Sequence, residues 1–191
     1  MPRLTDTRVR MIRTAARLLR RQGYAATGWR QVVAESHTPW GSQAHHFPGG
    51  KEQLAVEAVT ASGAAYEQLL ASVFADNHPA DTVTAWAIVA AKELQATGWA
   101  DGCPVATVAL ETAHVSENLA AACESAFTSW RTVIANSIRS RGLPAGEANS
   151  LATLVLAGIE GALLLARAAR DPAPLRDVAR ELAAVLHARL D

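Results

Sequence analysis

The segment from Leu151 to Ala166 carries a single charged side chain, Glu160. A helix that is apolar on every side is not an ordinary surface helix, because an exposed helix keeps a polar face. The segment therefore predicts a helix that is buried, either in the core of one chain or against a second copy of itself. Small residues such as Gly158 and Gly161 would let a neighbouring helix approach closely.

The rest of the chain also favours helices. Alanine is abundant, aromatic residues make up only 5% of the chain, and no stretch alternates apolar and polar residues over a strand's length. We expect an all-α protein of about nine helices. Their approximate ranges are 5–22, 29–35, 40–47, 51–74, 81–96, 104–113, 117–141, 144–170 and 173–189. In the first helix, the spacing of Val9, Ile12, Ala16 and Leu19 predicts a buried stripe, and Gly23 is a natural stop.

The charge of the chain is divided between its two ends. Residues 1–51 hold nine basic and two acidic side chains, a difference of +7, and the remaining residues balance it with −7. A net charge of zero would argue against a partner of high negative charge, but this asymmetry favours a polyanion bound at the amino-terminal end. The alternative is an arginine-rich helix face that is simply solvated.

Several classes of protein are not expected. No apolar run is long enough and free enough of charge to predict a membrane span, and no secretory signal is recognisable. Two cysteines, Cys103 and Cys123, make no disulfide framework, so we expect a cytoplasmic protein. Adjacent His45 and His46 point to different faces of a helix and cannot share one metal ion. A single Glu-x-x-His, beginning at Glu111, is not a di-iron site, and no other catalytic motif occurs. We expect no enzyme, no metal and no cofactor.

Two short predicted helices, joined by a turn and preceded by a basic helix, fit a helix-turn-helix. The second of these helices would enter the major groove of DNA, with Thr38 as its N-cap and Pro39 in its first turn. Small or polar residues near its start suit that role. Trp40 is open to a second interpretation, packing against the neighbouring helix. The predicted DNA-binding residues are Thr27, Thr38, Pro39, Trp40, Gly41, Ser42, His45, His46 and Lys51.

These residues carry a family resemblance. The run Gly23-Tyr24, Thr27, Val32-Val33, Trp40-Gly41-Ser42 and His45-His46-Phe47-Pro48-Gly49-Gly50-Lys51-Glu52-Gln53-Leu54 resembles the DNA-binding domain of the TetR family of bacterial repressors. The Pro-Gly-Gly-Lys form and several segments of the body, such as Gly102-Cys103-Pro104, are similar to its LmrA/YxaF-like branch. Two residues depart from the family pattern, namely His37 in place of a glycine and Ala44 in place of a tyrosine, and they suggest an operator that is read differently.

The resemblance implies a three-helix DNA-binding domain over residues 1–52 and a helical ligand-binding and dimerisation domain over residues 53–191. It implies a ligand-responsive transcriptional repressor that binds a palindromic double-stranded operator as a homodimer, with no membrane association. The apolar helix described above would then lie in the dimer interface, and the alternative is the core of a monomer. The predicted interface residues are Leu151, Leu154, Ala157, Gly158, Gly161, Leu165, Leu182 and Leu186.

Large aromatic side chains in the body predict a pocket for a small apolar or aromatic effector. The predicted ligand-binding residues are Trp86, Trp99, Cys103, Leu110, Glu111, His114, Phe127 and Trp130. The pair Phe127 and Trp130, three residues apart on one helix, is of a kind that belongs more often to an ordinary core than to a pocket. Two alternatives stay open: a DNA-binding regulator without a small-molecule ligand, and an enzyme or ligand carrier that has lost DNA binding.

Overall fold

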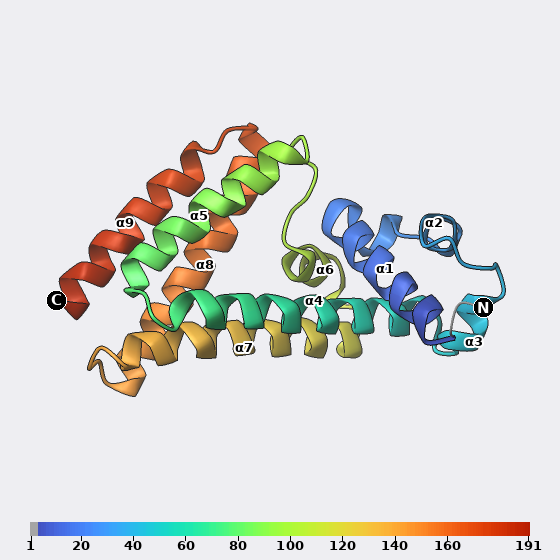
Figure 1. Cartoon of the computed structure of the whole chain (residues 1–191), viewed down its shortest axis with the longest axis horizontal. Coiled ribbons are helices and arrows are strands. Elements are labelled where there is room, and N and C mark those ends of the chain that lie inside the picture. Colours follow the sequence, from blue (N-terminus) through green and yellow to red (C-terminus); the bar gives the residue numbers. More distant parts are fainter. Residues whose placement is uncertain (1–3) are drawn as a thin grey trace. The chain divides into compact units, whose positions relative to one another are not determined.

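The computed structural model describes residues 4–191, so Arg3 of the basic segment lies outside the described residues. Within this range the chain is all-α, as predicted, and forms no strand (Figure 1). The helices are α1 (Leu4–Ala26), α2 (Trp29–Glu35), α3 (Ser42–His46), α4 (Gly50–Phe74), α5 (Pro79–Ala96), α6 (Pro104–Thr112), α7 (Glu117–Arg139), α8 (Ala145–Ala169) and α9 (Ala173–Leu190).

The helices form two compact units. Unit 1 comprises Met1–Ala64 and Cys103–Ala126, and unit 2 comprises Ala65–Gly102 and Phe127–Asp191. The boundary predicted between residues 52 and 53 lies near the start of α4, whereas the compact units divide that helix after Ala64. Residues 103–126, which include α6, belong with the amino-terminal helices because α6 packs along α1.

In unit 1, the core is built on α1. Met11, Ala15 and Leu18 are buried, together with Leu19. The predicted stripe was therefore right at Leu19 and wrong at Val9, which is 44% exposed. The buried residues Met11, Ala15 and Leu18 follow the helical spacing i, i+4 and i+7. Their face of α1 is therefore rotated by about one residue from the face that the sequence predicted.

The end of α1 is distorted at the predicted stop. Gly23 has φ +79° and ψ −176°, which is not helical, and the helical turns resume as far as Ala26. Only glycine adopts this backbone region readily. The hydroxyl of Thr27 then donates a hydrogen bond to the Gly23 carbonyl at 2.6 Å and fixes the bend.

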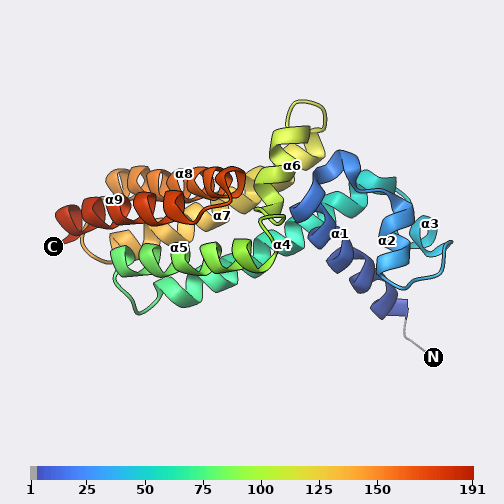
Figure 2. The same ribbon diagram turned by 90° about the horizontal axis from the view of Figure 1, so that it is seen from above.

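In unit 2, α5, α8 and α9 lie side by side (Figure 2). Their buried side chains include Val83, Ile159 and Leu175. The carboxyl-terminal part of α4 joins α7 through Ser137, whose hydroxyl donates to the Phe74 carbonyl at 3.2 Å. By length and hydropathy α8 would be able to cross a membrane, but a core helix of a bundle passes the same test. Ala152, Val155 and several other side chains of α8 are buried within the unit.

Candidate DNA-binding surface

The turn between α2 and α3 has a left-handed residue. His37 takes φ 51°. Residues with a β-carbon adopt this region less readily than glycine does. The Arg10 guanidinium donates to the His37 carbonyl at 3.3 Å, and the His37 amide donates to the Ala34 carbonyl at 3.2 Å. The conformation of the turn is thus the one that a glycine would favour, although the residue is histidine.

The recognition helix begins later than predicted. Residues 39–41 form a turn in which the Ser42 amide donates to the Pro39 carbonyl at 3.1 Å, and α3 starts at Ser42 with Gly41 as its N-cap. The prediction that Thr38 caps this helix is wrong, because its hydroxyl lies 2.8 Å from that of Ser36 in a buried pair. The Thr38 hydroxyl is thus hydrogen-bonded within the buried turn, as buried polar groups usually are, and does not reach the amides of α3.

Two of the predicted DNA-binding residues are buried: Thr27 and Thr38 have 3% and 8% of their surface exposed. The other predicted DNA-binding residues of the turn and α3 reach the surface: Pro39, Trp40, Gly41 and His45 are exposed, and Ser42 and His46 are half-buried. No residue of α3 is buried. Next to α3 lies a hollow of about 660 Å³, lined by Thr7, Arg10, His37, Pro39, Gly41, Ser42, His45 and His46.

A guanidinium and three imidazoles line this hollow, those of Arg10, His37, His45 and His46. The rings of His45 and His46 lie 4.9 Å apart between centroids. Partial burial, followed by His45 and the Arg8 guanidinium, holds the pKa of His46 below its ordinary value. Arg8 is paired with Glu57 at 2.6 Å and lies 5.5 Å from the centroid of the Phe47 ring. Ser42 and the two histidines supply donors that suit phosphates or base edges.

Lys51 is the second residue of α4, as predicted, but its side chain is directed to the end of α1. Its ammonium donates to the Ala25 carbonyl at 3.3 Å and lies 4.3 Å from the centroid of the Tyr24 ring. Partial burial lowers the pKa of Lys51, and the Glu111 carboxylate opposes this shift. In this structure the Lys51 side chain thus contacts the last residues of α1, directly after the bend at Gly23.

Comparisons with known proteins agree with this geometry. Residues 11–58 match the model of bacterial regulatory proteins of the tetR family, and residues 79–181 match that of the C-terminal domain of LmrA/YxaF-like transcriptional regulators. The chain belongs to the TetR family, with an LmrA/YxaF-like carboxyl-terminal domain. It is a transcriptional regulator with a helix-turn-helix DNA-binding domain, not an enzyme.

Individual relatives extend over nearly the whole chain. The HTH-type transcriptional regulator YxaF of Bacillus subtilis is 39% identical, over 93% of this chain and 93% of that protein. The regulator LmrA of the same organism is 37% identical, over 89% of this chain and 91% of that protein. A crystal structure of a TetR transcriptional regulator from Chloroflexus aurantiacus is 28% identical, with a TM-score of 0.82 and coverage of 98% and 97%. The TetR fold is thus shared over both units.

In this TetR-family chain, the predicted ligand-binding residues do not form one group. Cys103, Leu110, Glu111 and His114 belong to unit 1. Leu110 is 76% exposed and His114 is exposed, which does not suit the lining of an apolar pocket. The Glu111 carboxylate accepts a hydrogen bond from the Ala25 amide at 2.7 Å. Glu111 therefore caps the end of α1. The Cys103 sulfur, half-buried, accepts from the Ala106 amide at the start of α6.

The aromatic predictions in unit 2 do come together. Trp130 is 1% exposed, with the Phe127 ring edge-on at 5.5 Å between centroids. Tyr66, which sequence reasoning missed, lies 4.9 Å from Trp130, and its hydroxyl accepts a hydrogen bond from the indole of Trp86. Nothing in its alanine-rich surroundings marks Tyr66 in the sequence. Trp99 is half-buried and takes φ 66° after Gly98.

The predicted interface residues fall into two sets. Leu151, Leu182 and Leu186 are buried within the chain, and a β-carbon at half-buried Gly158 would lie 3.0 Å from Leu182. These four residues pack inside unit 2. The other set is exposed on α8, with Leu154 at 48% and Leu165 at 58%. It consists of Leu154, Ala157, Gly161 and Leu165, and the structure adds exposed Leu164 and, on α9, Val185.

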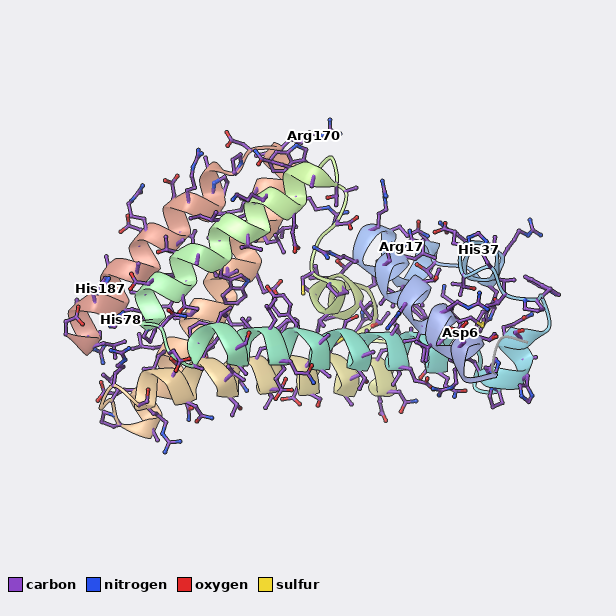
Figure 3. The ribbon with its side chains drawn as sticks, viewed as in Figure 1. Asp6, Arg17, His37, His78, Arg170 and His187 are labelled. Carbon is purple, nitrogen blue, oxygen red and sulfur yellow. The ribbon has the colours of Figure 1, made fainter. Side chains whose placement is uncertain are left out.

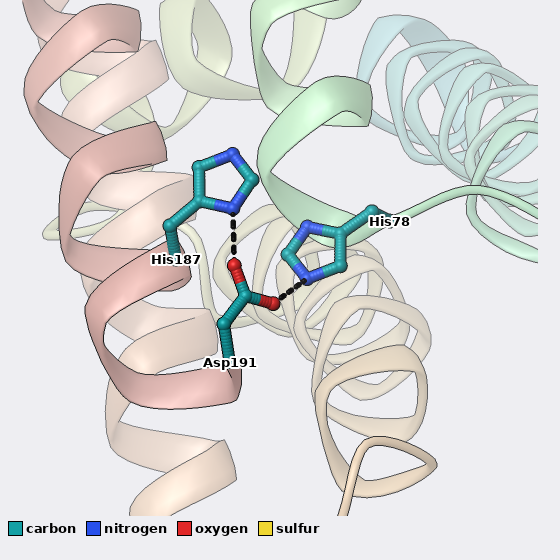
Figure 4. Close-up of side chains that lie close together, drawn as sticks. All are labelled: His78, His187 and Asp191. Atoms are coloured by element: carbon teal, nitrogen blue, oxygen red, sulfur yellow. Dashed lines mark hydrogen bonds and ion pairs between the residues drawn. The ribbon is translucent and has the colours of Figure 1, made fainter.

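Two histidines and a carboxylate meet near the end of α9 (Figures 3 and 4). Asp191 lies 2.8 Å from Nδ1 of His187 and 3.3 Å from Nε2 of His78. His78 Nδ1 already accepts the Ala80 amide hydrogen at 3.2 Å, so its Nε2 carries the proton when the ring is neutral. The two rings are stacked, 7° from parallel, and one ion cannot lie in both ring planes. The cluster therefore fits a carboxylate that is hydrogen-bonded to His187 and lies at ion-pair distance from His78 better than a metal site.

Proposed function

We propose that this TetR-family chain is a repressor that binds a palindromic operator as a homodimer and is released by a small apolar or aromatic ligand. The observation that carries the proposal is the surface of α3, where no residue is buried and Ser42, His45 and His46 present hydrogen-bond donors beside a hollow lined by Arg10. Such donors on an exposed recognition helix suit phosphates and base edges in a major groove.

Operator binding is tested by a gel-shift titration with the intergenic DNA upstream of the gene. Binding should weaken steeply as salt concentration rises, because phosphate contacts release counterions. Ser42→Ala should change the base preference, while Ser140→Ala, a matched change at an exposed serine of unit 2, should leave it unchanged. A shift that is insensitive to salt, or an effect of equal size from both variants, would contradict the proposed reading of DNA by α3.

The exposed apolar residues of α8 and α9 support the homodimer. Leu154, Ala157, Gly161 and Leu165 recur at helical spacing along one face, so they leave a continuous apolar surface open to water. A second copy that covers this face would carry a second recognition helix for the neighbouring major groove, about 34 Å along the DNA.

The dimer is tested by light scattering. No side chain lies within 4 Å of a β-carbon built at Gly161, so Gly161→Glu adds charge without an internal clash. This variant should be monomeric and should lose operator affinity. Ala121→Glu, at an exposed alanine of α7, should stay dimeric. A Gly161→Glu protein that is still dimeric would refute this placement of the interface.

The cluster of Tyr66, Trp86, Phe127 and Trp130 supports an aromatic effector, because it joins large apolar faces to one hydroxyl. A ligand that prefers the form not bound to DNA shifts the population off the operator. The test is to titrate 2-naphthol, as an uncharged aromatic probe, and then a wider panel of aromatic compounds into the protein–DNA complex. If none of them releases the DNA, the alternative of a regulator without a small-molecule ligand is favoured. A regulator that binds a bacterial operator acts in the cytoplasm, so we propose this location as well.

A further inference from the structure

Trp40 is exposed to an extent that is unusual for its size. It lies in the turn that leads into α3 with 60% of its surface exposed, whereas Trp86 and Trp130 are buried and Trp29 and Trp99 are half-buried. The indole makes no ring contact with any other described residue. The sequence left open that Trp40 packs against the neighbouring helix, and this degree of exposure contradicts that interpretation.

The surroundings of Trp40 leave room for a partner. Its neighbours Pro39 and Gly41 are also exposed, and a β-carbon built at Gly41 would meet no atom within 4 Å. Hydrogen-bond donors follow closely in the chain: Ser42 and His45 line the hollow together with Pro39 and Gly41, the two neighbours of Trp40. A large apolar side chain is thus placed among polar groups that suit DNA, at the start of the recognition helix.

The chemistry of indole limits what Trp40 can recognise in a major groove. Indole has one N–H donor and no acceptor, so it cannot read a base pair through paired hydrogen bonds. Its large faces are apolar, and the only apolar group that a base pair presents in the major groove is the C5-methyl group of thymine. We propose that Trp40 is a specificity-determining residue that contacts a thymine methyl group in each half-site. This inference rests on the proposed operator binding by α3.

The experiment removes that methyl group alone. Sequences that bind the wild-type protein are first selected from a random duplex library, and thymines of the selected site are then replaced one at a time by deoxyuridine. We expect one thymine in each half-site at which the replacement raises Kd about fourfold, the effect of losing one buried methyl group, and about fifteenfold when both half-sites are changed. Binding is measured by fluorescence anisotropy of labelled DNA.

The Trp40→Ala protein is the decisive comparison. It should bind the thymine operator more weakly than the wild type and be indifferent to deoxyuridine at that position. Because Trp40 is mostly exposed, the circular dichroism and thermal unfolding of the Trp40→Ala protein should equal those of the wild type. A loss of binding would then not be due to a loss of folding. Trp40→Phe, which keeps an aromatic face, should retain part of the sensitivity to deoxyuridine.

The outcomes separate this inference from the proposed function. If wild-type protein selects no DNA sequence, operator binding itself fails. If it selects a sequence without a required thymine, or if Trp40→Ala keeps the same response to deoxyuridine, operator binding stands and the thymine contact is overturned. A Trp40→Ala protein that loses affinity equally for all sequences, with no effect of deoxyuridine in the wild type, would indicate stacking or backbone packing and would also overturn it.

Discussion

Charge is distributed differently when it is counted by compact unit than when it is counted along the chain. Residues 1–51 carry a net charge of +7, but unit 1 holds nine basic and seven acidic side chains, and unit 2 holds nine basic and eleven acidic ones. The acidic residues that unit 1 gains lie on α4, α6 and α7, and two of them support the helix-turn-helix. Glu57 pairs with Arg8, and Glu111 binds the end of α1. The net charge is therefore only +2 for unit 1 and −2 for unit 2, a much smaller difference than along the chain.

The two units are also stabilised in different ways. In unit 1, short helices are joined by turns whose hydroxyls and carboxylates are bonded to backbone groups, as at Thr27 and Glu111. In unit 2, long helices pack through small residues such as Gly158 and around a buried Trp130. Substitutions of one residue type in both units should reveal this difference.

The largest contrast is expected between two tryptophans. Trp130→Ala in unit 2 should lower the free energy of unfolding by about 3–5 kcal/mol, because it removes a fully buried aromatic side chain and leaves a cavity. Trp40→Ala in unit 1 should change it by less than about 0.5 kcal/mol, since the side chain is mostly in water. Urea unfolding followed by circular dichroism measures both. A large loss of stability in Trp40→Ala would show that the turn before α3 depends on packing after all.

Glycine substitutions should reverse the contrast. Gly23→Ala in unit 1 should lower the free energy of unfolding by about 2–3 kcal/mol, because φ +79° with ψ −176° is strained for a residue with a β-carbon. That carbon would also lie 1.6 Å from the Glu111 carboxylate and displace it from the Ala25 amide.

Gly146→Ala, in the first turn of α8, is the matched control in unit 2. A β-carbon there meets no atom within 4 Å, and alanine favours a helix, so the variant should be as stable as the wild type or slightly more so. Equal effects of the two substitutions in urea unfolding would contradict the stabilising role of the bend at Gly23 in α1.

A smaller effect concerns pH. The lowered pKa of His46 keeps this side chain neutral near pH 7 in the free protein. Partial burial is the main cause of this shift, His45 and Arg8 add to it, and Glu57 is paired to Arg8. A DNA phosphate beside the ring would raise its pKa, so binding takes up a proton and the affinity rises as the pH falls. Between about pH 8 and 6 we expect the operator affinity to rise about three- to tenfold. The uptake of one proton can raise it by at most about tenfold per pH unit.

The control for this prediction is again in the other unit. His46→Gln should flatten the pH dependence of operator binding, whereas His78→Gln in unit 2 should leave it unchanged. Anisotropy titrations at constant ionic strength test this. The same slope in wild type and His46→Gln would mean that the proton is taken up elsewhere, at His37 or His45.

The sequence was sufficient for the helices but not for several side-chain roles. Periodicity and turn residues predicted each helix to within a few residues, because apolar spacing, proline and glycine act locally. The roles of Lys51, Glu111 and Tyr66 depend on contacts with helices far away in the chain, and local patterns carry no signal for them. The exposure of Trp40 was equally unpredictable, since a tryptophan beside a proline suits a packed turn as well as an open one. Leu182 and Leu186 were assigned to an interface because their apolar spacing does not distinguish a partner helix of the same chain from one of another copy.

The smallest expected effect is a difference in reactivity between the two cysteines of unit 1. It provides a way to follow the unfolding of that unit by itself. Burial raises the pKa of Cys123 to about 11, and its sulfhydryl donates to the Val105 carbonyl at 3.6 Å, whereas Cys103 is half-buried at the start of α6. Because the thiolate is the reactive form, iodoacetamide at pH 8 should modify Cys103 in the folded protein and Cys123 only after unfolding, as read by intact mass.

The test uses a Cys103→Ser protein that also carries Trp29→Phe and Trp40→Phe, so that the remaining tryptophans all belong to unit 2. In this protein the labelling of Cys123 reports the opening of unit 1, while tryptophan fluorescence reports unit 2. The polar turns of unit 1 make its local opening less costly than the loss of the packed bundle. We expect half-complete labelling at a lower urea concentration than the midpoint of the fluorescence change. Coincident transitions would show that the two units, although built differently, unfold as one cooperative structure.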